Sequence, residues 1–112
     1  MSIWDNLFTN NIETSPIISE SISIEPDAPQ IGEEVRIKYD GMLAQNGASQ
    51  VYLHIGYDDN WHDLEDIPME RYTNGWYCNF VPEEKEMNFC FHDSANNWDN
   101  NNGQNWSLII SE

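Results

Sequence analysis

Apolar and polar residues alternate along most of the chain after residue 20. The segments 35–39, 51–55 and 87–91 each place an apolar side chain at every second position, with polar or small residues between. Because successive side chains of a strand point to opposite faces, this period of two predicts strands with one buried and one outward face. In the second segment the alternation turns His54 away from the buried side.

Turn-forming residues separate these segments at intervals of roughly ten residues. Proline, glycine or asparagine marks the turns at 26–32, 73–75 and 82–85, whereas the acidic stretch 57–68 is expected to be irregular. The sequence contains no heptad pattern and no internal repeat. We therefore predict an all-β fold, an immunoglobulin-like antiparallel β-sandwich of about seven to eight strands.

The first 19 residues depart from the β pattern. Trp4, Leu7 and Phe8 have the spacing of one face of a helix. A short amphipathic helix and a disordered tail are both consistent with this segment. We therefore divide the chain into an N-terminal arm or short helix at 1–19 and a sandwich domain at 20–112.

The chain is strongly acidic for its 112 residues. It carries four Lys and Arg against twenty Asp and Glu, a formal net charge of −16 at pH 7. Such a surface repels phosphate backbones and anionic lipid, which argues against nucleic acid and membrane partners. Five Trp, five Tyr and four Phe distinguish the chain from a disordered acidic segment. The remaining ligand classes are neutral molecules such as sugars, which carry no charge penalty, and cations.

The sequence gives two indications of location. No segment is long and apolar enough to span a bilayer. The first residues lack the basic and apolar regions of a signal peptide. We therefore expect a cytoplasmic location for the chain as given, and an extracellular one if it is a module of a larger secreted protein.

The segment 96–106 is crowded with asparagine and contains an isolated tryptophan, Trp98. Asparagine carries two N–H donors and an oxygen acceptor in one planar group, which suits the vicinal hydroxyls of a sugar. Asparagine and glycine also tolerate positive φ, so the backbone can bend sharply here. We therefore regard this segment as the best candidate for a ligand-binding loop. The alternative is an Asn-rich turn with Trp98 folded back over it.

The same segment resembles the W-D-N-N-x-G-x-N-Y signature of starch- and glycogen-binding modules. Family 25 carbohydrate-binding modules carry this signature, as do the related family 53 modules of starch synthases and the glycogen-targeting phosphatase subunits. Further segments are similar to the family at 51–61 (VYLHIGYDDNW), 75–77 (GWY) and 88–93 (NFCFHD). The resemblance covers residues 22–110. The chain departs from the pattern in having Trp106 at the final aromatic position and in the high acidity of 58–66.

The resemblance implies a non-catalytic domain that binds starch, glycogen or maltooligosaccharides without a cofactor. It implies that His54, Trp61 and Trp98 form an aromatic platform, and that Asn101 and Asn105 hydrogen-bond glucose hydroxyls. These roles suit a sugar, because a pyranose has an apolar C–H face that an aromatic ring can bury and a rim of hydroxyl groups that amides can pair with. The expected partner is therefore an α-1,4-glucan or a maltooligosaccharide.

Other functions stay open at this point. Exposed aromatic residues also suit a protein–protein interaction domain, in which they would be the main contacts. The acidic residues at 58–66 could bind calcium, although their spacing does not match an EF-hand. Glycoside hydrolysis needs two carboxylates across a cleft, and a sandwich of this size offers little cleft, so we expect no enzyme activity.

Cys78 and Cys90 flank the turn at 82–85, and we predict that they lie on adjacent strands of one hairpin. Direct pairing of the two positions would allow a disulfide. Free, buried thiols are expected instead in a reducing compartment. The two residues are too few for a disulfide-dense scaffold.

Overall fold

The computed structural model describes residues 17–19, 21–58 and 60–112, and these residues are almost entirely β. The helix expected around Trp4 lies outside them, as does most of the N-terminal arm. The one helix in the described ranges is α1, a single turn at Met42–Gln45, and no helix there is long and apolar enough to cross a membrane. The strands are β2 (Ile17–Ser19), β3 (Ile22–Glu25), β4 (Val35–Tyr39), β5 (Val51–Tyr57), β6 (His62–Pro68), β7 (Glu70–Tyr72), β8 (Gly75–Phe80), β9 (Glu86–Asp93), β10 (Trp98–Asp99) and β11 (Trp106–Ile109).

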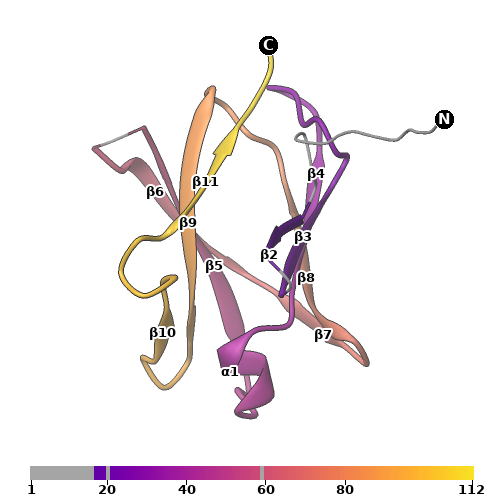
Figure 1. Ribbon diagram of the computed structural model, residues 1–112, viewed down its shortest axis with the longest axis vertical. Helices are drawn as coiled ribbons and strands as arrows, with labels where there is room; N and C mark the ends of the chain where they lie inside the picture. Colours follow the sequence, from indigo (N-terminus) through magenta and orange to yellow (C-terminus); the bar gives the residue numbers. More distant parts are fainter. Residues whose placement is uncertain (1–16, 20, 59) are drawn as a thin grey trace, which may run out of the picture.

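The strands form two antiparallel sheets that make a sandwich (Figure 1). One sheet has the order β2-β3-β4-β8-β7, and the other has the order β10-β9-β5-β6 with β11 also paired to β9. The predicted antiparallel β-sandwich is confirmed. The strand number exceeds the prediction because short strands such as β2 and β10 were not foreseen.

The core lies between the two sheets and is built from the alternating strand residues. Strands β4, β5 and β9 bury the alternate positions that the sequence pattern indicated. Tyr39 of one sheet stacks on Phe91 of the other, with ring centroids 4.1 Å apart, and Phe89 meets Phe91 edge to face. The intervening residues of these strands are thereby left on the outer faces of the sandwich.

Two expectations about the second half of the chain are wrong. The stretch 57–68 is not irregular, because most of it forms β6, which pairs with β5. The predicted hairpin around 82–85 does not form either, since β8 pairs with β4 and β7 whereas β9 pairs with β5 and β11. Cys78 and Cys90 therefore lie in different sheets, and both are free. Burial raises the pKa of the Cys78 thiol to about 12.

Candidate functional site

Cross-strand pairing gathers ring-bearing side chains on the outer face of the β10-β9-β5-β6 sheet. Tyr52 on β5 pairs with His92 on β9, and His92 pairs with Trp98 on β10, so these three residues form one row across the sheet. His54 is two residues further along β5, on the same face. Trp61, in the turn between β5 and β6, stacks on His54. We call these five residues the aromatic platform.

The rings of the aromatic platform are in mutual contact. His54 stacks on Trp61, with ring centroids 5.8 Å apart and an interplanar angle of 24°. Trp98 meets His54 edge on, at 5.2 Å and 89°, and its centroid lies 4.5 Å from that of His92. The Trp98 side chain is nevertheless 42% exposed. The structure thus brings together His54, Trp61 and Trp98, the three platform residues that the sequence indicated.

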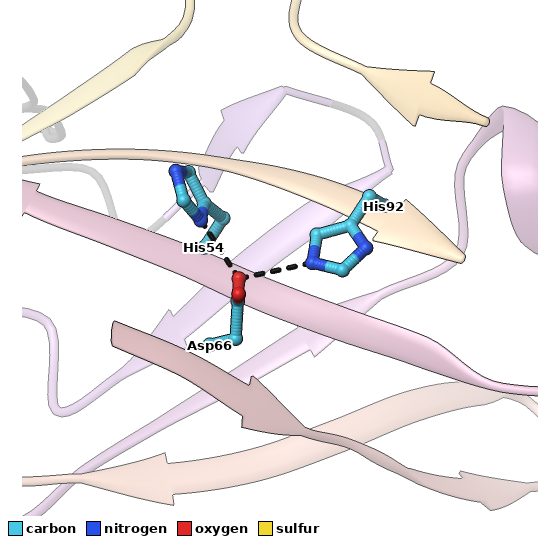
Figure 2. Close-up of side chains that lie close together, drawn as sticks. All are labelled: His54, Asp66 and His92. Atoms are coloured by element: carbon cyan, nitrogen blue, oxygen red, sulfur yellow. Dashed lines mark hydrogen bonds and ion pairs between the residues drawn. The ribbon is translucent and has the colours of Figure 1, made fainter. Parts of the chain in front are cut away.

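One carboxylate orients both histidines of the platform. Asp66 Oδ1 lies 2.7 Å from His54 Nδ1 and 2.9 Å from His92 Nε2, as Figure 2 shows. Partial desolvation alone would raise the pKa of Asp66, but the hydrogen bonds from His54 and His92 outweigh it and hold the pKa below its ordinary value. Because the Asp66 carboxylate can only accept, the protons of these two bonds are carried by His54 Nδ1 and His92 Nε2.

Sequence reasoning missed Asp66 and His92 as parts of this site. Asp66 is one of several acidic residues in the stretch expected to be irregular, and His92 lies just after the alternating segment 87–91. The missing signal was the register: Asp66 pairs with His54, and His92 pairs with Tyr52. A strand prediction for 62–68 would have placed Asp66 beside His54.

Gly56 leaves room for Trp61 on the outer face of β5. A Cβ at position 56 would lie 2.9 Å from Cδ2 and 3.0 Å from Cα of Trp61, with Cε3 closer still. Trp61 itself has a φ of 53°, and its backbone N–H donates to the carbonyl oxygen of Asp58 at 3.2 Å. Asn88 donates its side-chain amide to the same oxygen at 2.7 Å. The indole is therefore positioned both by a tight turn and by the absence of a side chain beneath it.

Positive φ angles account for much of the asparagine content of the 96–106 segment. This left-handed region is more accessible to asparagine than to most residues. Asn101 also donates its side-chain amide to the backbone oxygen of Asn105 at 3.0 Å, which closes the turn. Four asparagines adopt φ values between 58° and 66°: Asn96, Asn101, Asn102 and Asn105.

Two acidic side chains tether the loop that contains Trp98. Asp93 Oδ1 accepts the backbone N–H groups of Ala95 and Asn97, at 3.0 and 2.8 Å. The hydrogen bonds with Asn97, above all, hold the pKa of Asp93 below its ordinary value. Tyr39 donates its hydroxyl to Asp99 Oδ2 at 2.6 Å. Burial, followed by this bond, raises the pKa of Tyr39 well above its usual range, so the phenol stays a neutral donor.

A cleft of about 460 Å³ opens beside Trp98. The helix α1 and the strand β10, which contribute residues to its lining, lie together at one end of the sandwich (Figure 1). Asn101 and Asn102 line this cleft with Trp98, whereas Asn105 is not among its lining residues. Trp106 lines the cleft too, but it is only 8% exposed and packs on phenylalanines of β9. Of the two asparagines indicated by the sequence, only Asn101 therefore borders a cavity next to the platform.

Two groups of side chains in the described ranges have ligand atoms close enough to share one metal ion. Each combines histidine nitrogen with carboxylate oxygen, a donor set that suits zinc-like ions better than calcium. In both groups the ligand atoms lie within 4.8 Å of one another. The groups are His54, Asp66 and His92 on the platform, and Asp58, His62 and Glu84 at the edge of the same sheet.

The antiparallel sandwich and the rings on its outer face agree with the carbohydrate-binding class that the sequence indicated. Residues 35–89 match the model of the starch/carbohydrate-binding module family 53. The resemblance seen in the sequence is thereby confirmed over these residues.

A curated relative points in the same direction. An α-amylase of Clostridium acetobutylicum is 36% identical over 97 residues, a match that covers 83% of this chain and 13% of the relative. The chain thus corresponds to a small part of that enzyme's length. No solved structure matches the chain.

Proposed function

We propose that this module binds α-1,4-glucans, namely starch, glycogen or maltooligosaccharides, and that glucose rings stack on the aromatic platform. The observation that carries the proposal is the convergence of His54, Trp61 and Trp98, from three separate segments, on one exposed face. The family 53 match and the amylase relative support the class of ligand.

The angles within the platform favour a curved chain over a flat one. Trp61 is close to parallel with His54, whereas Trp98 is nearly perpendicular to it, so the two indoles do not share a plane. An α-1,4-glucan curves, and successive glucose units can present their C–H faces to rings that are set at an angle. A flat β-glucan would meet only one of the two indoles in this way. Burying the apolar face of each sugar supplies the attraction, and nearby polar groups supply the orientation.

Asparagine side chains next to the platform would complete the site. Asn101 lines the cleft beside Trp98, and one of its two N–H groups is used within the loop. An amide has a second N–H and two acceptor lone pairs, which can pair with hydroxyls of a glucose unit stacked on Trp98. Asn105 would contribute to the same set of hydroxyl contacts. A single site of this kind binds with a Kd of roughly 10 μM to 1 mM, and tandem modules in a longer protein gain further avidity.

Substitution of Trp98 tests the proposal most directly. Trp98→Ala should lower the affinity for maltoheptaose by about thirtyfold, because truncating a central aromatic contact costs about 2 kcal/mol. Titration calorimetry and pull-down on insoluble starch measure this effect. Tyr72→Ala is the matched control, since Tyr72 is similarly exposed at 51% but belongs to the other sheet. The proposal fails if the native chain does not bind, or if Trp98→Ala binds as well as Tyr72→Ala.

A paired substitution separates the backbone role of Asn101 and Asn105 from a role in binding. Glycine adopts positive φ without strain, whereas alanine does not. If the side-chain amides contact glucose, Asn101→Gly and Asn105→Gly should each weaken maltoheptaose binding about fivefold, the equivalent of one hydrogen bond of about 1 kcal/mol. Thermal melting of the Gly and Ala variants reports the backbone contribution. If the glycine variants bind maltoheptaose as well as the native chain, the side chains of Asn101 and Asn105 do not contact glucose, and the two residues only shape the loop.

A protein–protein interaction domain is the competing function. In the described residues, the large exposed apolar side chains outside the platform are spread over α1, β6, β7, β11 and the turn after β8. This scatter gives no second patch of comparable size, so the platform is the surface to test. Retention of the chain on insoluble starch, released by free maltoheptaose, distinguishes glucan binding from adhesion to protein.

A further inference from the structure

Two separate chain segments meet at the edge of the platform sheet in a cluster that contains none of the five platform residues. The cluster consists of Asp58 in the turn after β5, His62 at the start of β6, and Glu84 in the connection from β8 to β9. His62 Nε2 lies 3.1 Å from Asp58 Oδ2 and 3.1 Å from Glu84 Oε1. One ring nitrogen thus faces two carboxylate oxygens at equal distance, although it can carry only one proton.

The other nitrogen of the same ring is also held by a carboxylate. Asp63 Oδ2 lies 3.1 Å from His62 Nδ1. In metal centres a carboxylate commonly accepts the second ring N–H of a histidine ligand, which fixes the tautomer and turns the other nitrogen to the metal. His62 has this arrangement, with Nε2 directed at the two remaining carboxylates.

The negative charge of the cluster is not neutralised by a neighbouring lysine. Lys85 follows Glu84 in the sequence, but its Nζ pairs with Glu112 at 2.9 Å. Three carboxylates therefore surround one imidazole, which leaves net negative charge even when the ring is protonated. The whole chain adds to this potential with its net charge of −16.

We propose that Asp58, His62 and Glu84 form a binding site for a divalent transition metal ion of the zinc class. The ion takes His62 Nε2 and one oxygen from each carboxylate, and water completes the coordination. Histidine nitrogen and carboxylate oxygen are both zinc ligands, and zinc takes four ligands, whereas calcium takes six to eight oxygens. Asp63 acts from behind as the positioning residue for His62.

Titration calorimetry with zinc chloride at pH 7, on the full chain in a buffer that does not chelate metal, tests the site. His62→Ala should lower the zinc affinity at least a hundredfold, and Glu84→Gln at least tenfold. Asp63→Asn should lower it about tenfold, the effect typical of a lost partner behind a metal ligand. The emission of the neighbouring Trp61 should change with zinc in the native chain and not in His62→Ala. Calcium chloride should bind at least a hundredfold more weakly than zinc.

A comparator variant separates this site from the histidine pair on the platform. His92→Ala removes a ligand from the group formed with His54 and Asp66, and zinc binding at the proposed site should survive it. The proposal is overturned if the native chain binds no zinc, if the isotherm is unchanged in His62→Ala, or if His92→Ala abolishes it instead. Circular dichroism spectra that match those of the native chain establish that each variant is folded. None of these measurements depends on glucan binding.

Discussion

Both outer faces of the sandwich carry one exposed and one half-buried ring, Trp98 and Trp61 on one face and Tyr72 and Tyr77 on the other. On the second face a cation covers the aromatic surface, because the guanidinium of Arg36 lies 4.4 Å from the centroid of Tyr77. On the platform face the rings contact each other and two histidines, with no Lys or Arg among their described ring contacts. The two faces therefore differ less in the number of their rings than in what covers them.

This difference follows from which residues alternate with the core positions. On β4 the outward residues are Arg36 and Lys38, two of the four Lys and Arg in the chain. On β5 they are Tyr52, His54 and Gly56. Arg36 lies over the Tyr77 ring and would compete with a ligand for it. Gly56 has no side chain, so the indole of Trp61 can lie against β5. Under the proposed function, the platform rings can take a glucan because no cation covers them in the described contacts, whereas Arg36 covers Tyr77.

Among substitutions that leave every platform residue in place, filling the space at Gly56 should have the largest effect on glucan binding. In Gly56→Ala the new methyl group would overlap the indole and approach the backbone of Trp61, and a clash in packed surroundings costs about 1–3 kcal/mol. The indole must move away from His54, so we expect maltoheptaose affinity to fall at least tenfold. Calorimetric titration of the folded variant measures this loss.

A double substitution identifies the cause of that loss. In a Trp61→Ala background the added methyl group meets no indole, so Gly56→Ala should lower the affinity little further. Losses that add fully in the double variant would show that Gly56 acts through the strand rather than through the position of Trp61.

The fold and the platform residues were accessible from the sequence to different degrees. Period-two alternation in β4, β5 and β9 sufficed for the sandwich, because burial on one face dictates that pattern. The Asn-rich surroundings of Trp98 already indicated a ligand-binding loop, whereas His54 and Trp61 were assigned to the platform only through the family resemblance.

The partners of those rings were not accessible, for a physical reason. Asp66 reaches His54 and His92 only through the register of β6 with β5 and of β5 with β9. Register depends on bulges such as the irregularity between Ile55 and Tyr57, which sequence alternation does not reveal. The same limitation explains why β8 and β9 were assigned to one hairpin, since a turn does not specify whether the chain stays in its sheet.

Removing the charge at Asp66 should affect the platform less than Gly56→Ala does. Asp66→Asn keeps an oxygen acceptor but loses the charge that favours both histidine bonds, and the carboxylate is half exposed. We therefore expect maltoheptaose affinity to fall threefold to tenfold, or about 1 kcal/mol for one weakened hydrogen bond. An unchanged affinity would mean that the two rings hold their positions without Asp66.

The pH dependence of stability gives an independent measure of the same bonds. The pKa of Asp66 lies below its ordinary value of 3.8, so the native state favours the charged form. Its contribution is present above pH 3.8 and disappears as the pH falls through the lowered pKa. The difference in melting temperature between native chain and Asp66→Asn should therefore shrink as the pH falls from 5 toward 2. A difference that grows on acidification would contradict this assignment.

The smallest effect is expected on the opposite face, where Arg36→Ala uncovers Tyr77. Loss of an exposed cation–π contact costs about 0.5–1 kcal/mol, so the free energy of unfolding should fall slightly in urea. Maltoheptaose affinity should stay within twofold of the native value, because Arg36 and the platform lie on different sheets.

The same variant tests whether uncovering a ring is sufficient to create a binding surface. A second equivalent of bound maltoheptaose in Arg36→Ala, lost again in Arg36→Ala/Tyr77→Ala, would show that removing the arginine over a ring is enough to let that ring bind glucan. A single equivalent would mean that the platform also needs its second indole, set at an angle to the first.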